Sequence, residues 1–261
     1  MLSAFDNCTN LVNAPVIPNS VNSISGTFRN CYNLVNIPLI PNSVINMSQT
    51  FFGCSNLVNA PKIPNDVTNM AWTFYNCLNL VNASEIPNNV TNMLSTFYGC
   101  EKMINAPKIP NSVITMTSTF NGCSNLVNAP VIPNSVVDML GTFYGCSNLV
   151  NAPVIPNSVI NMKSTFVICY NLVTAPVIPN SVINMSETFH YCHNLTGNII
   201  IHSEFINNAN LMFYGSKLEK NVYIPFQNNG VNTTTYNTFI NEGYSTTTRK
   251  DGVLLFDINS L

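Results

Sequence analysis

Charged residues are scarce in this chain. Asp, Glu, Lys and Arg make up only 8% of its 261 residues, and the formal net charge at pH 7 is −2. Such a surface lacks the clustered lysines and arginines that neutralise phosphate groups, so we expect no nucleic-acid partner. Solubility then depends on the many Asn, Ser and Thr side chains, since apolar residues account for 46% of the chain.

Long hydrophobic runs are missing as well. A proline interrupts the apolar pattern in nearly every stretch, and no run approaches the roughly 18 residues that a membrane-spanning helix needs. We therefore expect no membrane insertion. The first ten residues, MLSAFDNCTN, lack a basic start followed by an apolar stretch, so no secretory signal is visible in this chain.

Histidine is nearly absent. The first 189 residues contain none, which leaves a serine or cysteine nucleophile there without the histidine base of a catalytic triad. No glycine-rich phosphate loop is present either, so we expect neither an enzyme nor a bound cofactor. All three histidines gather near one cysteine: His190, Cys192, His193 and His202. Because H-x-C-H is not an established zinc spacing, we predict no metal site there.

Cysteine, by contrast, is abundant and evenly spaced. Nine cysteines follow one another at intervals of 23 residues: Cys8, Cys31, Cys54, Cys77, Cys100, Cys123, Cys146, Cys169 and Cys192. Aligned on them, each unit reads roughly C-x-N-L-V-N-A-P-x-I-P-N-S-V-x-N-M-x-x-T-F-x-x. An undisturbed period is typical of a solenoid, in which identical units stack. One cysteine per coil places neighbouring side chains in parallel, which suits a disulfide poorly, so we expect buried free thiols.

The apolar spacing within the unit predicts a short helical turn on one side of the coil. Met47, Phe51 and Cys54 are spaced i, i+4 and i+7, which would put them on one inward face. Leu57 and Ile63 are predicted as inward anchors on the other side.

The A-P-x-I-P stretch is too proline-rich for a helix and predicts a parallel strand instead. Pro61 and Pro64 cannot donate to a ladder, so they should bracket a strand of only two or three residues. Asparagines recur nearby at one position of the unit, and their side-chain amides are predicted to hydrogen-bond from coil to coil. These residues are Asn10, Asn33, Asn56, Asn79, Asn125, Asn148, Asn171 and Asn194.

The repeat resembles a known family. The pattern C-x-x-L, I-P, V and T-F-x-x-C is carried, for example, by Cys123, Leu126, Ile132, Pro133, Val136, Phe143 and Cys146. It resembles the BspA-type leucine-rich repeats, and V-x-N-M-x-x-T-F is similar to repeats of bacterial surface lipoproteins. The resemblance covers residues 1–195 and implies a right-handed leucine-rich solenoid with roles in adhesion or protein binding. The A-P-x-I-P stretch is one residue longer than the usual I-x-I-P, which leaves the strand pairing open.

The two ends of the chain differ from each other. Residues 1–195 are predicted to form the solenoid, and residues 196–261 a degenerate last repeat, with Ser216 near the cysteine position, followed by a polar C-terminal cap. The fold class is thus α/β: nine to ten units with short parallel strands on one side and short helical turns on the other. Met1 and Phe5 already occupy repeat positions, so the edge of the first coil is predicted to be covered by another chain, another copy or a missing segment.

Binding information in a solenoid must lie where the copies differ. The residue after A-P is one such position, predicted to point outward as a stripe with a charged centre, or alternatively to reflect ordinary surface drift. It reads Val16, Leu39, Lys62, Glu85, Lys108, Val131, Val154 and Val177. A second candidate is aromatic and includes Trp72, Tyr75 and Tyr98, although stacking between coils would explain these residues equally well.

Together these features predict a binding or adhesion scaffold that recognises a protein or glycan at an extracellular, cell or virion surface. The alternative is a structural component of a phage virion or another surface assembly, which docks through its first coil. The segment TYNTFINEGYSTTTRKDGVLLFDI favours a phage origin, because it is similar to the endings of repeat proteins encoded by phages and prophages of gut bacteria. Self-association distinguishes the two hypotheses, since only the structural component requires it.

Overall fold

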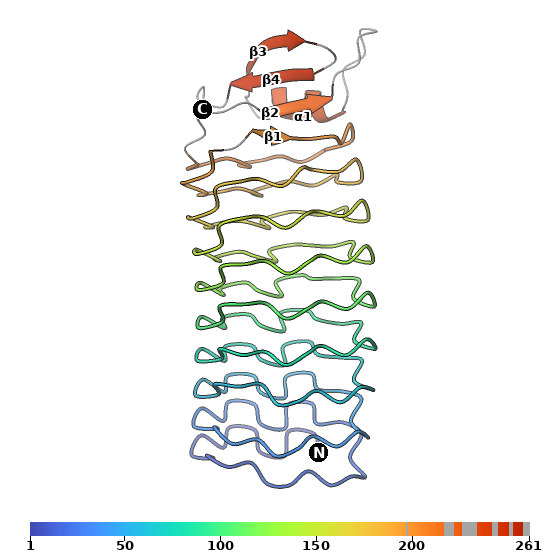
Figure 1. The fold of residues 1–261 in the computed structure, drawn as a ribbon, viewed down its shortest axis with the longest axis vertical. Helices are drawn as coiled ribbons and strands as arrows, with labels where there is room; N and C mark the ends of the chain where they lie inside the picture. The colour runs from blue at the N-terminus through green and yellow to red at the C-terminus, as the bar shows by residue number, and fades with distance from the viewer. Residues whose placement is uncertain (197, 217–221, 226–233, 242–244, 251–252, 258–261) are drawn as a thin grey trace.

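The repeats stack into one elongated array. The computed structural model describes residues 1–196, 198–216, 222–225, 234–241, 245–250 and 253–257. Figure 1 shows the coils lying one above another along a straight axis, with the N-terminus at one end and a small group of strands and a helix at the other. No helix among the described residues is long and apolar enough to cross a membrane.

The interior of the array consists of side-chain columns, each contributed by one repeat position. From the second coil onward, the Leu, Ile, Val, Met, Phe and Cys columns are buried, with at most 5% of a side chain exposed. The inward positions predicted for Leu57 and Ile63 are confirmed. The phenylalanine rings stack from Phe5 to Phe213 with 5.6–5.8 Å between neighbouring centroids. A continuous core therefore runs through the coils.

The segment from Met47 to Cys54 differs from the predicted helical turn in its backbone. Its inward face is as expected, since Met47, Phe51 and Cys54 are fully buried. Alternate amides, however, donate to the next coil, as Phe51 N does to the Thr73 carbonyl oxygen at 2.9 Å. The amides between them close β-turns, as Thr50 N does onto the Met47 carbonyl oxygen at 3.1 Å. The helical prediction is therefore wrong, and consecutive turns bonded to the next coil take its place.

Two positions per coil adopt the left-handed backbone conformation that these turns require. In the third coil they are Gln49, with φ 55°, and Gly53, with φ 73°. The second position holds Gly or Asn in most coils, and these residues tolerate positive φ at little cost. In one coil it holds Ile168, with φ 61°. A β-branched residue in this region is an outlier, so the backbone is strained at this position.

Replacing this isoleucine should stabilise the protein. We expect Ile168→Gly to raise the free energy of unfolding by about 1 kcal/mol, because glycine removes the clash of the branched Cβ. Urea unfolding would measure the change. Ile183→Gly is the matched control, since Ile183 is also partly exposed but is not among the residues with positive φ, and it should lose stability. An equal loss in both variants would show that Ile168 is not strained.

The parallel contacts between coils lie at asparagine positions. Isolated parallel bridges such as Asn59–Asn82 recur along the array, and a second column of bridges runs through the asparagine of V-x-N-M. Among the described residues, the one bridge at the predicted position joins Ile178 to Ile201, next to the C-terminal elements. The strand predicted after Pro61 is therefore wrong for the array, because the flanking prolines lack the amides that a ladder needs.

Asparagine side chains reinforce this stacking. The predicted ladder is confirmed between Asn33 and Asn56, whose side-chain amides are 3.1 Å apart. It continues along the run Asn125, Asn148, Asn171 and Asn194. The asparagine of V-x-N-M has a different role, because Asn69 Oδ1 accepts from Ala71 N at 3.0 Å, an Asx-type contact that opens the turn segment.

The last coil ends at Ser216, which takes the place of the cysteine. Its Oγ donates to the Phe189 carbonyl oxygen at 2.6 Å and accepts from Cys192 N at 2.8 Å. The elements at this end are β1 (Ile199–Ile200), β2 (Val222–Pro225), α1 (Thr234–Asn241), β3 (Ser245–Lys250) and β4 (Val253–Asp257).

The strands form one sheet in the order β1-β2-β4-β3, in which β1 and β2 are parallel and the other pairs antiparallel. Helix α1 is tied to the last coil by Thr235 Oγ1, which donates to the Ser203 carbonyl oxygen at 2.6 Å. The division into residues 1–195 and 196–261 stays a prediction.

Candidate binding surface

The residue after A-P stands on the outer face of every coil. The isoleucine that follows it, such as Ile132 or Ile155, is buried, so the residue before it points the other way. Val131 and Val154 leave 85% and 87% of their surface in solvent. We call this column the stripe, and all of its members are exposed: Val16, Leu39, Lys62, Glu85, Lys108, Val131, Val154 and Val177.

Shallow grooves separate neighbouring members of the stripe. The groove between Val131 and Val154 is mostly apolar, and its walls are Ala129, Pro130, Ile132, Pro153 and Pro156 with the single polar residue Asn134. The groove between Lys62 and Glu85 is more polar and is lined by Ser84, whose Oγ donates to the Pro61 carbonyl oxygen at 2.6 Å. The stripe therefore alternates protruding side chains with small hollows.

The centre of the stripe carries three charges of alternating sign. Lys62, Glu85 and Lys108 occupy successive coils and are all exposed. Among the described residues, the ion pair closer than 4.0 Å is the one between Asp6 and Arg29, so the three stripe charges do not pair with one another.

A family comparison agrees with the stacked repeats. The model of the BspA type leucine rich repeat region matches six copies in residues 2–127, 62–166 and 119–244. The chain belongs to this family. Among solved structures, this BspA-type chain is similar to a leucine-rich cell surface protein from Faecalibacterium prausnitzii, with 20% identity, 84% of this chain and 76% of that chain covered, and a TM-score of 0.46.

A second similar structure is a leucine-rich repeat protein from Bacteroides ovatus, with 19% identity, coverage of 84% of this chain and 77% of that chain, and a TM-score of 0.33. A search of the curated proteins finds no match to this BspA-type chain.

The aromatic candidates of this BspA-type array are arranged as a stack. Tyr75 lies between Phe52 and Tyr98, with ring centroids 4.5 Å and 4.4 Å away and nearly parallel planes. Trp72 is half-buried and has a left-handed backbone, with φ 55°. Stacking between coils accounts for the two tyrosines, and a binding role for the aromatic residues stays a prediction.

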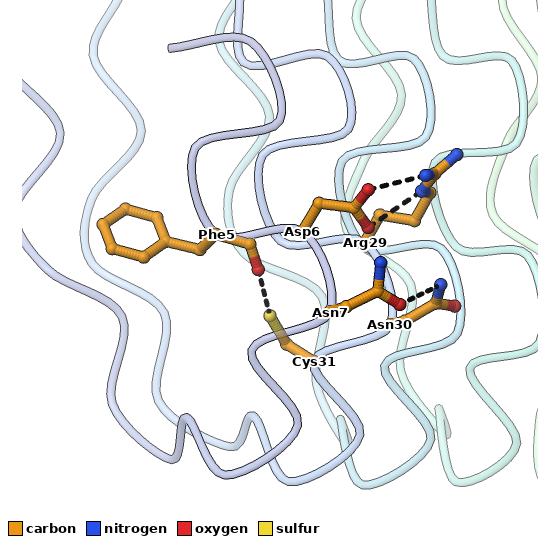
Figure 2. A network of polar contacts seen from close by, with 6 residues as sticks. All are labelled: Phe5, Asp6, Asn7, Arg29, Asn30 and Cys31. Carbon is orange, nitrogen blue, oxygen red and sulfur yellow. Dashed lines mark hydrogen bonds and ion pairs between the residues drawn. The ribbon is translucent and has the colours of Figure 1, made fainter.

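The cysteine column of the BspA-type repeats is part of the hydrogen-bonded core. Figure 2 shows Cys31 Sγ pointing at the Phe5 carbonyl oxygen, at 3.1 Å, and the same bond recurs up to Cys192 and Phe166, at 3.0 Å. All nine thiols are free, as predicted, and all but Cys8 are buried. Burial raises the pKa of Cys31 to about 11. These thiols act as packed donors.

The first two coils are also joined by side chains on their outer surface. Arg29 reaches Asp6 with two hydrogen bonds, of 2.9 Å and 2.6 Å, and this contact lowers the pKa of the Asp6 carboxyl. Asn30 Nδ2 donates to Asn7 Oδ1 at 3.0 Å (Figure 2). Phe5 is half-buried, and its ring points away from these contacts. The predicted self-association through this edge stays a prediction.

The histidines lie apart from the stripe except for His202, which lines its last groove. His193 stacks on Tyr170 with 4.9 Å between ring centroids, and His190 packs against Tyr214 at 5.2 Å. No group of three or more His, Cys, Asp or Glu side chains suited to a metal ion occurs in the described part of the chain.

The sequence analysis missed a second outward column. The residue after the valine of P-N-S-V is exposed, as shown by Ile114 at 56% and Ile160 at 41%. The alternation of buried and exposed residues along this segment could have predicted the column, since Val113 and Val159, which precede these isoleucines, are buried. These isoleucines provide matched controls for the stripe.

Proposed function

We propose that the chain is a non-enzymatic binding and adhesion protein of a cell or virion surface, whose stripe docks a protein partner. The exposure of Val131 and Val154 carries this proposal. Single exposed apolar residues are ordinary, but valines that contribute almost nothing to their own core recur here in adjacent coils. The family supports a scaffold built for recognition.

The chemistry of the stripe favours a protein over a glycan. Sugars are bound by aromatic platforms and dense hydrogen-bonding groups, whereas the stripe has no aromatic residue and the groove between Val131 and Val154 is walled by alanine, proline and isoleucine with one polar residue, Asn134. Apolar side chains of a protein partner fit such hollows, because their burial removes apolar surface from water on both sides.

Binding of the labelled chain to cultured epithelial cells tests the proposal. We expect the double variant Val131→Ser/Val154→Ser to bind at least about tenfold more weakly, since two buried valines would be lost from the interface. The double variant Ile114→Ser/Ile160→Ser is the control and should bind like the parent chain.

Treatment of the cells separates the two partner classes. Protease should abolish binding and glycosidases should leave it intact; the reverse result would assign the site to a glycan. Equal binding by both double variants and the parent chain would show that the stripe is not the docking surface.

A further inference from the structure

We propose that the stripe docks against the stripe of a second copy of this chain in antiparallel orientation, with the two-fold axis between the coils of Glu85 and Lys108. The inference rests on the proposed function, because it concerns the same surface: a second copy covers the stripe in the free protein and gives way when the stripe docks on a cell.

The order of residues along the stripe is close to a chemical palindrome. Two apolar residues are followed by three charges of alternating sign and then by three apolar residues. In a two-fold contact, residue i meets j and j meets i. The axis proposed here puts Glu85 opposite Lys108 of the second copy, and the same pair forms again on the other side of the axis.

The same register matches the apolar ends. Val16 then meets Val177 of the second copy, and Leu39 meets Val154. Lys62 meets Val131, against which the aliphatic stem of the lysine can pack while its ammonium group stays in water. Every position of the stripe has a partner, and no charge faces a like charge.

Other arrangements are electrostatically worse. A parallel pair would bring each stripe charge against its own copy, and an antiparallel axis through Glu85 or through Lys108 would do the same for that residue. An axis between Lys62 and Glu85 pairs those two charges equally well, but it leaves the last two valines of the stripe, Val154 and Val177, without a partner. Charge complementarity thus excludes the like-charge arrangements, and the pairing of all eight positions selects the register.

The geometry of the chain allows this contact along the whole stripe. The stripe charges make no ion pair with any residue that the structure describes, so they can pair with a second copy. The array is straight in Figure 1 and its period is unbroken, so two stripes can run side by side without losing register. The grooves between coils receive the valine side chains that protrude from the facing copy.

Charge reversal provides the test. We expect the parent chain to form a dimer in sedimentation velocity runs between about 1 μM and 1 mM. Glu85→Lys and Lys108→Glu should each weaken the homodimer by at least about tenfold, because each variant opposes like charges across the axis. An equimolar mixture of the two variants should dimerise again, since each copy then carries the charges that complement the other.

Glu101→Lys serves as the control, because Glu101 is exposed but lies outside the stripe, and it should dimerise like the parent chain. A parent chain that stays monomeric at about 1 mM, or a mixture no more associated than either variant alone, would overturn the inference. The proposed function has its own readout: a monomeric chain that still loses cell binding on Val131→Ser/Val154→Ser would refute the dimer and retain the docking surface.

Discussion

Raising the pH from about 8 to about 10 should unfold the protein. Eight cysteines are completely buried in one column, and burial raises the pKa of the Cys192 thiol to about 12 and that of Cys31 to about 11. Cys100 and Cys146 lie in the middle of the array, and burial raises their pKa well above the ordinary value. The folded chain therefore keeps its thiols protonated well into the alkaline range.

The loss of stability at high pH follows from proton binding. In the unfolded chain each thiol titrates near its ordinary pKa of about 8.5, so above that pH the unfolded state has fewer bound protons than the folded state. Stability is then fully present at neutral pH and falls as the pH rises. Each thiol contributes a slope of about 1.4 kcal/mol per pH unit, so eight thiols contribute about 11 kcal/mol per pH unit. A rise of one pH unit above the ordinary pKa therefore removes about as much free energy as the whole stability of a typical domain.

Urea unfolding at a series of pH values, under reducing conditions, measures this slope. The double variant Cys100→Ala/Cys146→Ala is the control for its origin. It should be less stable at neutral pH, but its slope above pH 9 should be lower by about 3 kcal/mol per pH unit. An identical slope in the variant and the parent chain would assign the alkaline sensitivity to other groups, such as tyrosine.

The interior of this fold was largely predictable from the sequence. A fixed 23-residue period places each repeat position in one column, so deciding that Phe51 or Leu57 points inward decides it for every coil. The hydrogen bonds of the backbone were not predictable in the same way. Spacing of i, i+4 and i+7 fits a helix, but a run of turns with two left-handed residues returns side chains to one face just as well. The better signal was the recurrent Gly or Asn at the position of Gly53.

The stripe, too, was only partly predictable from the sequence. Its outward direction follows from the buried isoleucine beside each member, which the repeat pattern already indicates. The absence of ion pairs among Lys62, Glu85 and Lys108 depends on side-chain conformations and on the separation of the coils. A sequence pattern does not determine either of these. The replacement of proline by Ser84 in the central coil, and its hydrogen bond to the coil before it, is equally a product of the three-dimensional stack.

Removing one ring from the phenylalanine column should lower the free energy of unfolding more than truncation of an aromatic residue outside that column. Phe120 is completely buried between Phe97 and Phe143, whose centroids lie 5.6 Å and 5.8 Å away. We expect Phe120→Ala to lower the free energy of unfolding by about 3–5 kcal/mol, from lost burial and from a cavity that rigid neighbours cannot close.

The expected loss of stability is large because each coil contacts only its neighbours. A defect in a central coil therefore weakens the interfaces on both of its sides. Tyr98→Ala is the comparison, since Tyr98 also stacks on a neighbouring ring but lies half-exposed at the surface, and it should lose only about 1 kcal/mol. Urea unfolding of both variants measures the difference. Equal losses would mean that the stability of the array comes from ring stacking itself, wherever the rings lie, and not from the buried column.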